Sequence, residues 1–438
     1  MRPRIALIEP YWDFWESSVA FDLRADRAAF AAAVRAALPV EWVAPGQADA
    51  VLVLQTMATP PAPTLAQLGE LPVVIWAAHR GDAALGDAFD HGAITAQGAT
   101  VGAPMLTSML VRAGRPFELV LGRVEDPGTV AAVAAALAGA AAATRLRRAR
   151  IGRVGAPIAG YDCVDTDAAL LRRATGIELV PIGSAELRDA YEAVAPDRVA
   201  ELERETRATY DVELAGDGLE RSLRAACALD DLVARHALDA GAMNCHVPEI
   251  RLGDPIGIAP CFALGRSTTN GVPWTCAGDV LTAVAMLAAK LLGGAAQYHE
   301  LEAVDHASGE LVLASSGEFD LALAPAAQPR LIANGWFAAD PCTGACACFS
   351  APAGPATLIG FAQVGAGYRL IAAEGAFTGR AFPATGTANG GFRFDRGLDA
   401  WTDWCRAGAN HHSSATPGAL APALGAVARF LGIEAVRV

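Results

Sequence analysis

Hydrophobic residues in the N-terminal third occur in short continuous runs that alternate with segments of helical periodicity. The predicted strands are Arg4–Glu9, Val40–Val43, Ala50–Leu54, Pro72–Trp76 and Phe117–Leu121, and the predicted helices are Arg27–Ala37, Thr64–Leu68, Met105–Ala113 and Pro127–Arg147. Strands that alternate with helices predict a parallel sheet covered on both faces. No G-x-G-x-x-G motif follows the first strand, so we expect a doubly wound domain without the dinucleotide-binding fingerprint.

The same alternation begins again near residue 149 and changes near residue 325. The second region has predicted strands Arg150–Val154 and Ile177–Ile182, predicted helices Glu186–Arg207 and Leu219–Leu238, and a loop-like stretch Leu252–Val272. The third has short predicted strands Leu331–Phe337, Ala356–Gln363, Tyr368–Glu374 and Phe392–Phe394, and a final helix Pro422–Leu431. The predicted fold class is α/β, with two doubly wound domains at 1–148 and 149–325 and a barrel-like β-rich domain at 326–438.

One stretch, Gly271–Leu323, carries both an apolar helix and the densest group of carboxylates. Asp279 is a favoured helix-start residue, and Gly293-Gly294 predicts the helix end. Two strands with alternating polarity follow, at Tyr298–Asp305 and Glu310–Ala314.

Composition excludes several classes of protein. The chain has 438 residues, of which 53% are hydrophobic and 18% charged, so it can bury large cores. A net charge of −13 argues against non-specific nucleic-acid binding, which needs a basic face. The N-terminus lacks the long apolar segment of a signal peptide, and Val130–Ala143 is too short for a membrane span. Nine irregularly spaced cysteines fit reduced thiols, and we expect a cytoplasmic protein without a membrane partner.

Carboxylates gather within the central stretch, and a second polar cluster, Asn410–Ser414, lies far downstream. The carboxylates are Glu300, Glu302, Asp305 and Glu318. Their oxygens suit Mg²⁺ or Mn²⁺ and also suit proton transfer. We expect the two regions to meet at a cation, with Glu300 and Glu302 on one strand face and Asp305 on the other. The alternative is a solvated strand face.

The downstream cluster contains adjacent histidines, His411 and His412. Adjacent side chains point in different directions on most backbones, so we expect at most one of the two to be a metal ligand. The neighbouring serine and asparagine residues are suited to orienting a ligating ring. The alternative is a surface or interdomain pair.

Other polar residues offer weaker signals. Cys342, Cys346 and Cys348 lack a C-x-x-C spacing, so we expect buried small hydrophobes rather than a zinc site. Cys245 or Cys276 as a catalytic thiol would need a base, for which His246 and His299 are available. The loop that carries His246 and Glu249, together with Arg266, is a candidate substrate-binding region.

At these residues the chain resembles the L-arabinose isomerase / L-fucose isomerase superfamily. The order of two α/β domains and a β-rich domain is similar, and so is Cys276–Asp279, which looks like the family's E-G-D segment. Tyr298–Asp305 looks like the strand that carries its acidic ligand, and Leu313–Leu323 like the segment that carries a histidine. Gly408–His412 is similar to the family's late G-x-H-H, and Leu431–Glu434 to its L-G-I-E ending.

The resemblance implies an aldose–ketose isomerase acting on an open-chain sugar through a cis-enediol. It implies a divalent cation, Mn²⁺ with Mg²⁺ or Co²⁺ as alternatives, bound by Glu300 and His412. It also implies substrate-binding roles at the site, for which His246, Glu249, Arg266 and His411 are candidates. By analogy with the family we expect a homo-oligomer, a trimer or hexamer.

The chain departs from the family's pattern at two ligands. Ala277 stands where the E-G-D segment has glutamate, and Ser315 stands near the expected histidine. Alanine neither binds a metal nor moves a proton, so another group has taken the role or the reaction is lost. We expect Glu300, Glu318 and Asp279 to be catalytic, with Glu249 and Cys276 as further candidates. The alternatives are a sugar-binding protein without turnover and an enzyme that uses a cysteine nucleophile.

Overall fold

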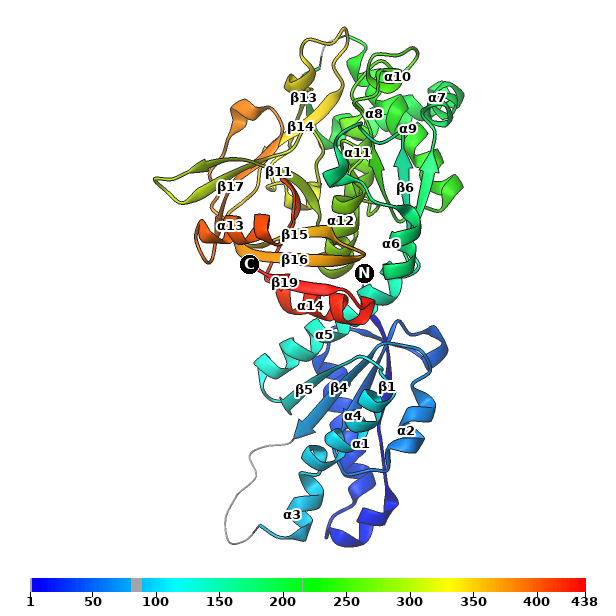
Figure 1. The fold of residues 1–438 in the computed structure, drawn as a ribbon, viewed down its shortest axis with the longest axis vertical. Coiled ribbons are helices and arrows are strands. Elements are labelled where there is room, and N and C mark those ends of the chain that lie inside the picture. Colours follow the sequence, from blue (N-terminus) through cyan, green and yellow to red (C-terminus); the bar gives the residue numbers. More distant parts are fainter. Residues whose placement is uncertain (1, 80–88, 215) are drawn as a thin grey trace. The chain divides into compact units, whose positions relative to one another are not determined.

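The structure is a computed structural model that describes residues 2–79, 89–214 and 216–438. The chain forms two compact units, one of Met1–Arg145 with Pro422–Gly432 and one of Leu146–Ala421 with Ile433–Val438 (Figure 1). Parallel sheets with helices occupy the first unit and part of the second, and a large β-rich sheet forms the rest. The predicted fold class is therefore confirmed.

The first unit contains a five-stranded parallel sheet in the order β2-β1-β3-β4-β5. The strands are β1 (Arg4–Ile8), β2 (Glu41–Trp42), β3 (Ala50–Gln55), β4 (Val73–His79) and β5 (Phe117–Arg123). The helices are α1 (Leu23–Ala37), α2 (Pro61–Gln67), α3 (His91–Ala96), α4 (Ala99–Arg112), α5 (Pro127–Leu146) and α14 (Ala421–Leu431). Strands β3 and β4 are almost wholly buried, as expected for central strands of a sheet covered on both faces.

Helix α5 is the one helix of the described residues that is long and apolar enough to cross a membrane. Within the protein, 61% of its apolar window is buried. At Gly139 the helix lies so close to α14 that an added Cβ would fall 2.4 Å from the Ala423 carbonyl oxygen. This close helix packing is typical of a core helix.

The second unit begins with a four-stranded parallel sheet in the order β10-β9-β6-β7. Its strands are β6 (Arg150–Val154), β7 (Glu178–Ile182), β9 (Ala240–Met243) and β10 (Trp274–Thr275). Its helices are α6 (Ala168–Thr175), α7 (Ser184–Ala193), α8 (Pro196–Thr209), α9 (Gly218–His236), α10 (Pro248–Arg251), α11 (Cys261–Thr269) and α12 (Val280–Gly293). The predicted helix Glu186–Arg207 is two helices, because Pro196 begins α8 where its missing N–H costs nothing.

The remaining strands form one large sheet, in the order β19-β16-β15-β18-β11-β12-β17-β14-β13-β8. These strands are β8 (Asp211–Val212), β11 (Gln297–Asp305), β12 (Glu310–Ala314), β13 (Arg330–Ala333), β14 (Ala345–Ser350), β15 (Gly354–Val364), β16 (Gly367–Phe377), β17 (Ala388–Phe394), β18 (His412–Pro417) and β19 (Glu434–Arg437). Because β16 also pairs with β17, six strands from β16 round to β17 close into an antiparallel barrel. This sheet includes β11, which begins at Gln297, before the predicted domain boundary at 325/326. That boundary stays a prediction.

Several elements were not predicted from the sequence. These include strands β14 and β18 and helices α11 and α13 (Asp399–Arg406), of which α13 is a short amphipathic helix that buries Ala400 and Trp404. Helix α11 falls inside the stretch expected to be a loop, and all but two of its residues are buried. A helix buried on nearly every side has no polar face, so it gives no amphipathic signal.

Helix α12 links the parallel sheet to the barrel. The Asp279 side chain accepts a hydrogen bond from the Thr282 amide at 2.7 Å, and Gly294 ends the helix in the left-handed conformation at φ 77°. Both helix ends are those predicted. Residues Val280–Ala289 are all buried, and the helix contacts β9 of the parallel sheet and β15 and β18 of the barrel.

A buried ion pair fixes the end of this helix. Lys290, the only lysine in the sequence, places its Nζ 2.7 Å from Oδ2 of Asp320, and their side chains are 7% and 0% exposed. Asp320 also accepts hydrogen bonds from the amides of Ala296 at 2.7 Å and Ala322 at 3.1 Å. The pair therefore joins the last turn of α12 to the loop that follows β12.

Replacing the lysine tests this joint. We expect Lys290→Met to lower the free energy of unfolding by about 3–5 kcal/mol, because the Asp320 carboxylate stays buried without its cation. Urea unfolding followed by circular dichroism measures the change. Arg330→Met, which breaks the exposed pair with Glu213, is the matched control and should have little effect. Equal effects of the two substitutions would contradict the structural role of Lys290.

Candidate active site

The carboxylate cluster and the histidine cluster meet where β11 and β18 pair. In this antiparallel register Glu300 lies opposite His412. The Glu300 carboxylate accepts a hydrogen bond from the Ser316 hydroxyl and a longer one of 3.4 Å from the Tyr298 hydroxyl. Two regions more than a hundred residues apart in the sequence thus form one site, as predicted.

The His412 ring is held from one side. Its Nδ1 lies 2.6 Å from Oδ2 of Asp279, and both side chains are almost wholly buried. Burial lowers the pKa of His412, but the hydrogen bond to Asp279 and the charges of Asp279, Glu300 and Glu318 outweigh it, so the pKa is raised. Because Nδ1 is occupied, Nε2 is the nitrogen left to bind a ligand.

His411 faces the same cluster. The two histidine rings lie 4.0 Å apart between centroids, and each offers a nitrogen within 4.8 Å of the other's nitrogen and of a Glu300 oxygen. Both rings therefore lie where they could bind an ion, and the expectation that at most one of them is a ligand stays a prediction. Strand β18 begins at His412, so His411 lies before the strand and is not subject to its alternation.

Tyr161 also belongs to the site, and sequence reasoning missed it. Its hydroxyl lies 3.0 Å from Nε2 of His411, across 250 residues of sequence. Burial and the neighbouring acidic groups, Glu300 among them, raise its pKa to about 12, so the phenol stays protonated. A lone tyrosine in the loop after β6 gives no signal in a single sequence.

Glu318 is fully buried close to the cluster. Neither carboxylate oxygen has a hydrogen-bond partner among the described residues, although the Cys276 thiol lies near enough to lower the pKa slightly. Burial, the largest effect, together with the charge of Glu300 raises the pKa to about 7. A buried carboxyl group with this pKa is suited to exchanging a proton at neutral pH.

The two positions that depart from the family pattern lie beside the cluster. Ala277 is 6% exposed and has φ 53°, a left-handed conformation that costs a residue with a Cβ about 1 kcal/mol. Ser315 is fully buried, and its hydroxyl accepts a hydrogen bond from the Gly317 amide. The neighbouring Ser316 hydroxyl reaches Glu300 in this segment.

Other predicted site residues lie elsewhere. A β-bulge at Glu302 interrupts the alternation of β11. Simple alternation therefore does not assign Glu300 and Glu302 to one strand face and Asp305 to the other. Asp305 pairs with Arg380 at 2.7 Å, and this hydrogen bond helps to lower its pKa to about 2. Arg266 pairs with Asp230 at 2.7 Å, and Glu249 is exposed on α10. No described contact joins Asp305, Arg266 or Glu249 to Glu300 or His412, whereas burial and the charge of Glu300 raise the pKa of Glu302.

The cysteines fall into two groups. Cys346 and Cys348 are buried on β14 as small hydrophobes, as predicted, while Cys342 is half-buried with its thiol 3.5 Å from Asp217. Cys245 and Cys276, both buried, lie with their sulfurs 2.9 Å apart and with His246 beside them. Burial lowers the pKa of His246, with smaller effects from the charges of Arg251, Glu300 and His412.

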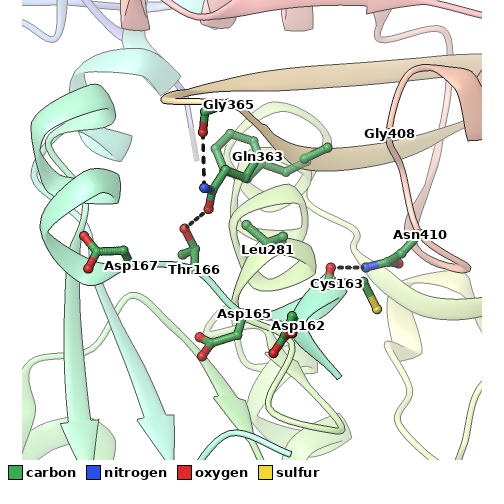
Figure 2. A pocket seen from close by; sticks show the side chains of 12 residues that line it. Asp162, Cys163, Asp165, Thr166, Asp167, Leu281, Gln363, Gly365, Gly408 and Asn410 are labelled. Atoms are coloured by element: carbon green, nitrogen blue, oxygen red, sulfur yellow. Dashed lines mark hydrogen bonds between the residues drawn. The ribbon is translucent and has the colours of Figure 1, made fainter. Parts of the chain in front are cut away.

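A cavity of about 580 Å³ opens next to the site (Figure 2). Polar groups line much of it, among them Asp162, Asp165, Thr166, Gln363 and Asn410. Two lining residues are sequence neighbours of the site: Asp162 directly follows Tyr161, and Asn410 directly precedes His411. The Asn410 side-chain nitrogen also donates to the Cys163 carbonyl at 3.2 Å (Figure 2). The cavity therefore lies beside Tyr161 and His411 and offers acceptors and donors to a polar ligand.

Comparison with known protein families identifies one related domain. Residues 306–434 match the family model of the L-arabinose isomerase C-terminal domain. This stretch contains Glu318, His411 and His412 and begins after Glu300. No protein of curated function matches the chain.

Over these residues the chain is similar to the C-terminal domain of L-arabinose isomerases, which supports a sugar isomerase-like family. The resemblance to the L-arabinose isomerase / L-fucose isomerase superfamily is thereby confirmed.

The buried Glu318 should reduce the stability of the protein at alkaline pH. Its pKa of about 7 lies above the value of about 4.3 in an unfolded chain, so stability falls as pH rises through this interval. We expect Glu318→Gln to be more stable than the original protein by about 1–3 kcal/mol at pH 8, with the gap closing near pH 4. Urea unfolding at the two pH values measures it, with exposed Glu249→Gln as control. Equal stability of Glu318→Gln and the original at pH 8 would contradict the burial of a charged carboxylate.

Proposed function

We propose that the protein is a divalent-metal-dependent aldose–ketose isomerase that acts on an open-chain sugar or a sugar-like substrate. The observation that carries the proposal is the convergence of Glu300, His411 and His412, with Asp279 occupying the inner nitrogen of His412. The C-terminal match supplies the reaction class.

The donor set suits a divalent cation of the first transition row. One carboxylate and two imidazoles within 4.8 Å provide three ligands and leave positions for substrate oxygens. Mn²⁺ is the ion we favour, with Mg²⁺ and Co²⁺ as alternatives. When bound, such an ion supplies Lewis-acid stabilisation of the negative charge that develops on the sugar oxygens.

Glu318 is the residue we assign to proton transfer. Isomerisation moves a proton between C2 and C1 of the sugar, and a base with a pKa of about 7 both accepts and returns it near neutral pH. Its buried, unpartnered oxygens are available for this role. Glu318 would thus replace the carboxylate that Ala277 cannot provide.

Asp279, predicted to be catalytic, has a different role in this proposal. One of its oxygens accepts from the Thr282 amide and the other contacts His412, so it has no oxygen left for substrate. It is a positioning residue that holds the ring of His412.

The polar surroundings fit a polyhydroxylated ligand. Tyr161 and His411 lie at the edge of the 580 Å³ cavity, whose carboxylates and amides would pair with sugar hydroxyls. His246, which the charges of Glu300 and His412 reach, is a candidate contact, whereas Arg266 and Glu249 have no described link to the cluster. A cytoplasmic homo-oligomer, trimer or hexamer, and the absence of nucleic-acid and membrane partners belong to the same proposal.

The alternative is a sugar-binding protein without turnover. Ala277 and Ser315 favour it, because each replaces an expected ligand. Binding of a sugar without exchange of its C2 proton in D₂O, at every added metal, would establish this alternative. A cysteine-nucleophile enzyme would instead lose activity on thiol alkylation and keep it after chelation.

Metal content tests the site directly. We expect near-stoichiometric Mn²⁺ after dialysis of the purified protein, and its loss in Glu300→Gln and His412→Ala, because each removes a ligand atom. Elemental analysis by mass spectrometry measures it. Asp305→Asn on the same strand, which breaks a pair with Arg380, is the matched control and should retain the metal.

Asp279→Asn provides a finer test in the same assay. We expect its Mn²⁺ affinity to fall by about 10–100-fold without being abolished, because it orients a ligand and is not one. Unchanged metal content in both Glu300→Gln and His412→Ala would overturn the proposed metal site.

The rate should depend on pH through Glu318. With an aldose found by screening pentoses and 6-deoxyhexoses, we expect activity to rise with pH through a midpoint near 7, because the base must be ionised. Glu318→Gln should lower kcat by about 10²–10⁴-fold and abolish the rise of activity with pH. The assay is ketose formation between pH 5 and 9. A variant that keeps both rate and pH profile would remove Glu318 from the mechanism.

A further inference from the structure

Two cysteines and a histidine meet where two parallel strands end. Cys245 and His246 follow β9, and Cys276 follows β10, which pairs in parallel with β9. The Gly278 amide donates to the Met243 carbonyl at 3.0 Å and so holds the two strand ends together. The carboxyl ends of parallel strands are where α/β proteins commonly bind ligands.

The three side chains converge on one point. The Cys245 and Cys276 sulfurs are 2.9 Å apart, and one nitrogen of His246 completes a set whose atoms all lie within 4.8 Å of one another. Both cysteines are buried, and His246 reaches the surface. Thiolate and imidazole together are a ligand set that zinc prefers over the oxygen-loving cations.

The backbone before the histidine is held in place. The buried Asn244 side chain accepts a hydrogen bond from the His246 amide at 3.2 Å, a local turn that fixes the loop. The His246 ring also lies edge-on to Phe337, with centroids 6.3 Å apart. The nitrogen of His246 is therefore placed by its surroundings.

A fourth group points to a ligand at this position. Glu318 is fully buried, its carboxylate oxygens have no hydrogen-bond partner among the described residues, and the Cys276 thiol is close enough to act on its pKa. A buried unpaired carboxylate is costly unless a cation or a donor joins it. The set of atoms that lie within 4.8 Å of one another does not include Glu318, so its charge favours a cation nearby and the fourth position stays open.

We propose that Cys245, His246 and Cys276 bind a soft divalent cation such as Zn²⁺, with the fourth position taken by water or another small ligand. This site shares no ligand with Glu300, His411 and His412, and it does not rest on the proposed isomerase activity. Binding releases the two thiol protons to solvent, so that both sulfurs bind as thiolates.

The fit requires a small movement. Two thiolates at about 2.3 Å from a tetrahedral zinc lie about 3.8 Å apart, so the sulfurs must separate from 2.9 Å. A disulfide would instead bring them to about 2.05 Å, with two electrons and two protons leaving to a hydroperoxide. The disulfide would make no use of His246, which is why we favour the metal.

Cobalt substitution distinguishes these outcomes. The full-length protein is reduced with a phosphine and titrated with Co²⁺, and near-ultraviolet thiolate-to-cobalt charge transfer is recorded. We expect a saturable band that Zn²⁺ displaces. It should weaken at least about tenfold in affinity in Cys276→Ser and in the exposed His246→Gln. Buried Cys227→Ser, on α9, and Glu300→Gln are controls and should retain the band.

Three results would overturn the proposal. They are the absence of a thiolate band in the reduced protein, an unchanged band in both Cys276→Ser and His246→Gln, and its loss in Glu300→Gln. If two fewer thiols titrate before reduction than after it, and the reduced protein gives no cobalt band, the two cysteines are a redox pair and not a metal site. Loss of Mn²⁺ in Glu300→Gln with the cobalt band intact would show that the two sites are separate.

Discussion

A hydrogen bond between the Asp279 carboxylate and the His412 imidazole joins the start of α12 to strand β18. The carboxylate also caps the helix through the Thr282 amide, so one side chain fixes both the helix start and the ring. Because α12 packs on the parallel sheet as well as on the barrel, this contact sets the site against both layers of the second unit. The burial of both partners makes the bond strong and its loss costly.

Around this contact the protein keeps features that cost stability. Ala277 adopts a left-handed conformation, Glu318 is buried without a hydrogen-bond partner among the described residues, and two thiols are held 2.9 Å apart. None of these is expected from packing alone, and each lies at the end of β10 or beside it. Strain and unsatisfied groups concentrated in one place are typical of a functional site.

Features that depend only on neighbouring residues were predicted from the sequence. The helix start at Asp279, the helix end at Gly294 and the strand at β11 follow from capping and alternation, and the pairing of the Glu300 and His412 regions followed from their chemistry. The bulge at Glu302 and the position of His411 depend on strand pairing between distant segments, which a single sequence does not reveal.

Tyr161 illustrates the same limit, since 250 residues separate it from its partner. The buried helix α11 has no polar face to produce periodicity. The thiol pair required the parallel register of β9 and β10, which places Cys245 beside Cys276.

Anomalous diffraction from crystals soaked in Mn²⁺ tests the account most directly. We predict a strong manganese peak between the Glu300 carboxylate and the outer nitrogen of His412, within bonding distance of both. A peak only at the cysteines, or none at saturating Mn²⁺, would contradict the metal-dependent mechanism.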